Sequence, residues 1–184
     1  MHIRKPVFVL PVLIGIFALE AQTPAPKAAP APAKPAAAPA AQAANLRQVM
    51  RGTFFPASNV IFFAQSSDPA AVPPGKDPST ATDPLANTYG KWEAVENASL
   101  AIAESARLLT VPGRKCANGL DVPLKNADWA KLVQGIREAG MACYRAAQTK
   151  DMDKILDAAG TLSEACAACH EKYRDKGGLA DRCK

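Results

Sequence analysis

Apolar residues recur at intervals of three and four along four stretches of the chain, which is the period of an amphipathic α-helix. The four predicted helices cover residues 45–65, 87–110, 126–148 and 151–175. In the first, Gly52 and Pro56 break the pattern, so we expect either a kink or two shorter helices that meet at Phe55-Pro56. Asn45 is a suitable N-cap for this helix. Val60, Ile61, Phe62 and Phe63 restore the apolar face beyond the break.

The fourth helix has the clearest inner face. It is predicted to consist of Ile155, Leu156, Ala159, Leu162, Cys166, Cys169, His170 and Tyr173, with Gly177-Gly178 ending the helix. The proline-rich stretch 66–87 is a long connection, and we expect it to pack across one end of the domain. No useful length of strand-like alternation occurs, so the fold class is all-α, an antiparallel four-helix bundle. Such bundles build cofactor sites between facing helices.

The first 44 residues do not fit this bundle. Residues 1–21 join a basic start to a short apolar run and a small-residue exit, which predicts a secretory signal peptide. The alternative is an uncleaved N-terminal anchor, the one case in which we expect membrane association. Residues 22–44 are almost all Ala, Pro, Lys and Gln, a composition typical of a semi-rigid linker. The bundle domain is therefore residues 45–184, and the expected location is the periplasm.

The charge of the chain gives little information about the function of the predicted domain. The chain carries 22 Lys+Arg and 17 Asp+Glu, but four of these basic residues and one acidic residue lie before residue 45. The predicted domain is thus close to neutral. This balance argues against a nucleic-acid partner, which would require a basic face.

The chemistry lies in Cys166-Ala167-Ala168-Cys169-His170, near the C-terminus. C-x-x-C-H is the attachment signature of c-type haem. On a helix, residues three and four apart share a face, so two thiols and one imidazole project together. The alternatives are a redox dithiol, a partial zinc site, or two core cysteines beside an incidental histidine. No βαβ pattern supports the dithiol, and zinc would require four ligands. The predicted cofactor is one haem c, with iron, per chain.

At this point the sequence resembles the class II c-type cytochromes, the cytochrome c′ family. The haem motif lies on the last helix, and Glu171-Lys172-Tyr173-Arg174 follows it, which is similar to the family's pattern of two residues, an aromatic and an arginine. The resemblance covers about Leu46 to Arg174 and implies a four-helix bundle. It also implies thioether bonds from Cys166 and Cys169 to haem, with His170 as the proximal iron ligand.

The resemblance leaves the sixth iron position open, because some family members keep it vacant and others fill it with a methionine of the first helix. Met50 is the candidate, on the apolar face of that helix. Alternatively, Met50 only packs in the core. Without ligation, Leu46, Phe54 or Phe55 would shield an open distal face.

Three further side chains are candidate haem contacts. Arg47 either reaches a haem propionate or stays solvated, and Arg174 has the same two alternatives. Tyr173, three residues after His170, is expected to pack on the haem edge.

Three cysteines remain outside the motif. A disulfide needs Cα atoms within about 7 Å, which residues in adaptable segments reach most easily. Cys116 lies in a loop and Cys183 in the C-terminal tail, so we predict this pair, with Cys143 a buried free thiol.

The leading functional hypothesis is an exported electron carrier that transforms no substrate and is not an enzyme. The second is a five-coordinate protein that binds NO or CO. The third is a haem-bearing subunit of a larger redox complex. Redox partners are not readable from the sequence, and a homodimer is a further candidate state.

Overall fold

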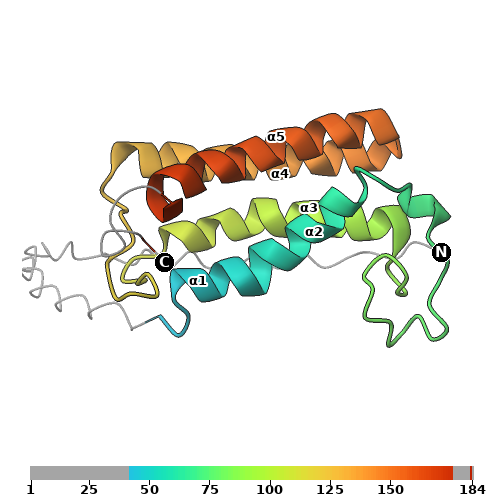
Figure 1. Ribbon diagram of the computed structural model, residues 1–184, viewed down its shortest axis with the longest axis horizontal. Coiled ribbons are helices and arrows are strands. Elements are labelled where there is room, and N and C mark those ends of the chain that lie inside the picture. Colours follow the sequence, from blue (N-terminus) through green and yellow to red (C-terminus); the bar gives the residue numbers. More distant parts are fainter. Residues whose placement is uncertain (1–41, 176–182, 184) are drawn as a thin grey trace, which may run out of the picture. The chain divides into compact units, whose positions relative to one another are not determined.

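The four predicted helical stretches are present in the computed structural model, which describes residues 42–175 and residue 183. They run alternately up and down as an antiparallel four-helix bundle (Figure 1). The expected signal peptide, residues 22–41 of the linker and Gly177-Gly178 lie outside the described residues. None of the described helices is both long and apolar enough to cross a membrane.

The first helical segment changes its hydrogen-bonding pattern twice. It consists of α1 (Leu46–Val49), a π-helical turn η1 (Met50–Phe54) and α2 (Phe55–Phe63). Asn45 caps it, since the backbone N–H of Gln48 donates to Asn45 Oδ1 over 2.9 Å and Gln48 Oε1 accepts from the N–H of Asn45 over 2.9 Å.

The π-turn is the form that the predicted interruption takes. In a regular helix the Pro56 ring would collide with the carbonyl of Gly52, four residues earlier. Here the N–H of Phe55 donates instead to the carbonyl of Met50, five residues earlier. The extra residue in the turn lets the helical path continue past a proline, so Met50 begins an irregular turn, a feature frequent at functional sites.

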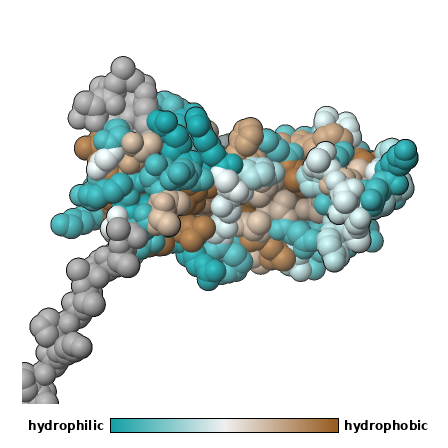
Figure 2. All heavy atoms as spheres, turned by 90° about the horizontal axis from the view of Figure 1, so that it is seen from below, coloured by the Kyte–Doolittle hydropathy of each residue, from teal (hydrophilic) through white to brown (hydrophobic). Residues whose placement is uncertain are grey.

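The apolar face of this segment is narrower than predicted. Val60 and Ile61 are buried as expected, but Phe63 is 41% exposed and Phe55 is 64% exposed. Figure 2, which shows the bundle of Figure 1 from below, has patches of hydrophobic surface between hydrophilic side chains. The prediction was wrong for Phe63 because α2 is apolar around most of its circumference, so sequence periodicity does not show which side faces the core.

The second helix starts later than predicted. It comprises α3 (Lys91–Ser105) and a 3₁₀ turn η3 (Ala106–Thr110). Asn87, at the predicted start of this helix, forms a turn, since its Oδ1 accepts from the N–H of Tyr89 over 2.8 Å. Gly90 precedes the helix because a Cβ there would lie 2.3 Å from the carbonyl oxygen of Leu85. The long connection before it contains a short 3₁₀ turn, η2 (Pro69–Ala71), which packs against α3.

The last two helices are the most regular. α4 (Ala127–Thr149) is followed by α5 (Met152–His170) and a second π-turn, η4 (Glu171–Asp175). Asp151 caps α5 by accepting from the N–H groups of Asp153 and Lys154. Leu156 was wrongly assigned to the inner face: it is 47% exposed, whereas its neighbour Ile155 is fully buried. One position along a helix is a rotation of about 100°, enough to leave the core.

Candidate functional site

The haem motif occupies the last turn of α5, so the three side chains have the helical spacing that the sequence predicts. Cys169 is buried, while Cys166 and His170 are half-buried. Both thiols are free and form no bond with each other. Burial raises the pKa of Cys169 to about 11 and also raises the pKa of Cys166, so both thiols are protonated at neutral pH.

The His170 imidazole is ready to act as a ligand. Burial lowers its pKa, which favours the neutral imidazole that a metal binds. No side chain or carbonyl in the described part of the chain forms a hydrogen bond with it. A half-buried, neutral and unpartnered imidazole beside two free thiols is a donor set that fits a covalently attached haem.

The surroundings of α5 are asymmetric. α5 packs along α4, but it has few contacts with α2. Figure 1 shows the C-terminal end of α5 at the same end of the bundle as α1. Met50 and Cys166, from these two segments, are both half-buried and pack against one hydrophobic core. α5 is therefore packed closely on its α4 side and loosely on the side toward the first helical segment.

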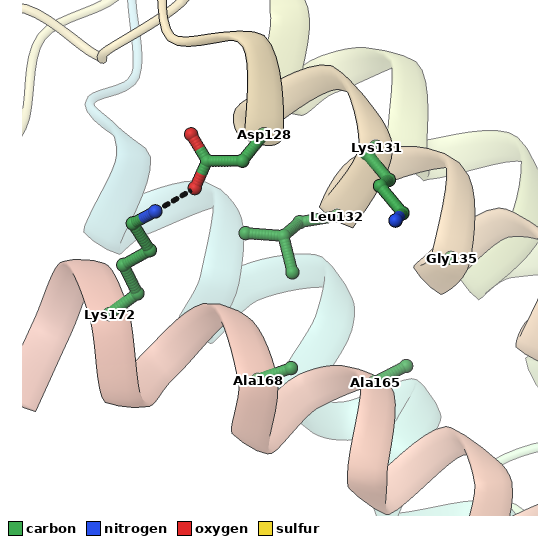
Figure 3. A pocket seen from close by; sticks show the side chains of 7 residues that line it. All are labelled: Asp128, Lys131, Leu132, Gly135, Ala165, Ala168 and Lys172. Carbon is green, nitrogen blue, oxygen red and sulfur yellow. Dashed lines mark ion pairs between the residues drawn. The ribbon is translucent and has the colours of Figure 1, made fainter.

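A surface groove of about 380 Å³ lies on another side of α5. Figure 3 shows its walls, which come from α4, α5 and the turn η4. The groove is lined by Asp128, Lys131, Leu132, Gly135, Ala165, Ala168 and Lys172. His170 follows Ala168 by two residues, a rotation of about 200° at 3.6 residues per turn. The imidazole therefore lies on a different face of α5 from this groove.

The residues predicted to lie on the distal side of the haem differ in how far they are exposed to solvent. Met50 is half-buried at the first position of η1, and Leu46 and Phe54 are buried on either side of it along the chain. Phe55 is mostly exposed, so the expectation that it could shield the iron is wrong. It follows Phe54 directly, and the helical rotation turns it outward. Arg47 is exposed one turn before Met50.

Tyr173 fastens the segment after His170 to the start of α4. Its hydroxyl donates to Asp128 Oδ1 over 2.8 Å and accepts from Asn126 Nδ2 over 3.2 Å. Its ring meets Trp129 edge-on, with the ring centroids 4.9 Å apart. Asp128 Oδ2 also forms an ion pair with Lys172. The hydrogen bonds from Lys172 and Tyr173 lower the pKa of Asp128.

Sequence reasoning missed the role of Asp128 in this network. Its partners are more than 40 residues away, and its only sequence signal was a position at a helix N-terminus. Arg174, a candidate haem contact, lies at the surface and hydrogen-bonds through Nε and Nη2 to the carboxylate of Asp175.

The remaining cysteines divide as their segments suggest. The structure pairs Cys116 with Cys183, the predicted pair, with their Cα atoms 5.0 Å apart. Cys143, on α4, is a free and fully buried thiol, and burial raises its pKa to about 12.

Comparison with known proteins places the motif in a family context. Residues 121–174 match the family described as Cytochrome C′. The match contains α4, α5, the part of η4 up to Arg174 and the whole C-x-x-C-H motif, and it supports a cytochrome c′ family member. Proteins of this family are four-helix bundles with covalently attached haem c, so haem c is the cofactor. No curated protein and no solved structure matches the chain.

Proposed function

We propose that this protein is an exported electron carrier, in which His170 and Met50 would both bind the haem iron. The position of Met50 carries this proposal. It is half-buried, begins the π-turn η1, and packs on the same core as Cys166. The bound haem would supply one-electron Fe(III)/Fe(II) chemistry.

The chain's own residues have three tasks in this proposal. Cys166 and Cys169 hold the cofactor, and His170 and Met50 set its iron environment. An axial methionine raises the reduction potential, as in His/Met cytochromes. Leu46 and Phe54, both buried, exclude water around Met50.

The proposed location is the periplasm. A basic start and a short apolar run in residues 1–21 support export, and five cysteines in the chain fit an oxidising compartment. Mass spectrometry of the native protein tests this, since removal of the signal segment gives a new N-terminus near residue 22. An intact N-terminus in a membrane fraction would contradict a released periplasmic protein.

Substitution of the methionine tests the electron-carrier proposal. The ferric wild-type protein should show the weak long-wavelength band of a Met–Fe bond. Met50→Ala should abolish that band, lower the reduction potential and admit CO to the ferrous iron. Met141→Ala is the control, because Met141 is another half-buried methionine, on α4.

The opposite result identifies the second candidate function. A high-spin ferric wild type that binds CO readily in its ferrous form, with Met50→Ala unchanged, would contradict Met50 ligation. The protein would then be a gas-binding cytochrome with an open distal position.

A further inference from the structure

The loop between η3 and α4 contains an unusual buried cation. Arg114 is only 6% exposed. Arginine is almost never buried this deeply without a partner, because removing a charge from water is costly. Within the described residues no carboxylate pairs with Arg114. Its guanidinium instead donates to two backbone carbonyls: Nε to Leu108, over 3.1 Å, and Nη1 to Ala44.

These two carbonyls belong to different parts of the bundle. Leu108 lies in η3, at the end of the second helix, and Ala44 directly precedes the cap of the first helix. The next residue of the loop strengthens this link, since the carbonyl of Lys115 accepts from the N–H of Leu46 over 2.8 Å. Side chain and backbone of the loop together fix where the helix that carries Met50 begins.

The same loop is tied to the segment that follows His170. Cys116, two residues after Arg114, is buried and paired with Cys183. The N–H of Cys183 donates to the carbonyl of Tyr173 over 3.0 Å, and Tyr173 lies three residues after His170. One short loop therefore contacts the start of the Met50 helix and, through the disulfide, the end of the His170 helix.

We propose that Arg114 is a positioning residue of the haem site, which sets the place of Met50 relative to His170. This inference rests on the proposed function, in which both residues bind the iron. It follows from the packing, because α5 has few contacts with the first helical segment, so apolar burial alone does not fix their separation. The fork-shaped guanidinium reaches two carbonyls in a fixed geometry, which the single ammonium of lysine does not reproduce.

The test uses the full haem-loaded protein and compares Arg114→Met with Arg107→Met. Arg107 is the matched control, since it is an exposed arginine in η3, at the same end of the bundle. In Arg114→Met we expect a weaker Met–Fe band, a lower reduction potential and a rise of about tenfold in the CO-accessible ferrous fraction, the scale that loss of charge-assisted hydrogen bonds predicts. Arg107→Met should match the wild type.

Two further variants keep the test decisive if Arg114→Met does not fold. Arg114→Lys retains the charge but loses the fork, and should show a smaller change in the same direction. The double variant Cys116→Ser/Cys183→Ser releases the other end of the loop and should also weaken the Met–Fe band. An unaltered band, potential and CO fraction in these folded variants, with only a lower unfolding temperature, would overturn the positioning role.

Failure of the proposed function gives a different pattern. If the wild type itself lacks a Met–Fe band, Met50 is not a ligand, whatever Arg114 does. Amide hydrogen exchange of residues 44–54 and the CO-binding rate then decide the positioning role alone. Faster exchange and a changed rate in Arg114→Met, but not in Arg107→Met, support it, and equal values in both variants contradict it.

Discussion

The middle of the bundle is held together differently from the end that carries Cys166, Cys169 and His170, which we call the haem end. In the middle, α3 and α4 approach so closely that a Cβ at Gly140 would lie 2.9 Å from the backbone nitrogen of Ala103 and 3.1 Å from the carbonyl oxygen of Ser99. Ser99 is buried, and its hydroxyl donates within its own helix, to Val95. The close contact between these two helices therefore depends on how well their surfaces fit together.

At the haem end, directional hydrogen bonds add to the packing. Tyr173 is bonded to Asp128 and Asn126, and Arg114 to two carbonyls. The two regions are thus stabilised in different ways. Tight helix packing cannot extend to the place where a bundle must admit a cofactor, so hydrogen bonds hold that end in position. Substitutions that change side-chain volume should therefore destabilise the middle of the bundle. Substitutions that remove hydrogen bonds or charge, and changes of pH, should destabilise the haem end.

The largest expected effect is that of Gly140→Ala. The added methyl group meets two backbone atoms that move only with their helix, and overpacking of this kind costs about 1–3 kcal/mol. We expect a net loss of about 2 kcal/mol in the free energy of unfolding, although alanine itself favours a helix.

Gly135→Ala is the matched control for this variant, since it lies on the same helix and a Cβ there has nothing within 4 Å. It should be neutral or more stable by up to about 1 kcal/mol. Denaturant unfolding of the haem-loaded proteins measures both. Equal stabilities of the two variants would show that the α3–α4 contact is not shape-limited.

Tyr173→Phe should have an intermediate effect, confined to the haem end. It removes the hydroxyl and both of its hydrogen bonds but leaves the ring that meets Trp129. We expect a loss of about 1 kcal/mol in unfolding free energy.

The control for Tyr173→Phe is Tyr144→Phe, which removes only a hydroxyl that accepts from Gln148 one turn away. That variant should change stability by no more than about 0.5 kcal/mol. If both variants lose the same stability, the Tyr173 network has no special part in holding the haem end.

The sequence predicts the scaffold well because local patterns determine it. The 3.6-residue period locates all four helical stretches, and Asn45 caps the first of them as predicted from its side chain. Features that depend on three-dimensional packing were missed. Leu156 has an apolar side chain but is 47% exposed, and Gly90 is explained only by the close approach of the carbonyl of Leu85.

The site divides in the same manner. C-x-x-C-H is a local signal, so Cys166, Cys169 and His170 can be read directly from the chain. The π-turn at Met50 results from Pro56 six residues later, and sequence periodicity shows an interruption there but not its form. The bonds of Asp128 and Arg114 join positions 45 and 70 residues apart, and no local pattern announces them.

The smallest expected effect, and the most specific, is the pH dependence of Asp128→Asn. The pKa of Asp128 is lowered by its hydrogen bonds from Lys172 and Tyr173, and the pKa of Lys172 is raised by its hydrogen bond to Asp128. A carboxyl group whose pKa is lowered in the folded state adds stability at pH values above its pKa in the unfolded state. This stability is lost as the pH falls through the pKa of the folded state. A lysine whose pKa is raised in the folded state adds stability at pH values below its pKa in the unfolded state. The Asp128–Lys172 pair therefore contributes fully at neutral pH. Asp128→Asn should thus be less stable than the wild type at pH 7, and this difference in stability should close below about pH 4.

Asp157→Asn, which changes an exposed residue on α5, is the control. A gap that stays constant between pH 7 and pH 3 would mean that charge at Asp128 does not hold the haem end.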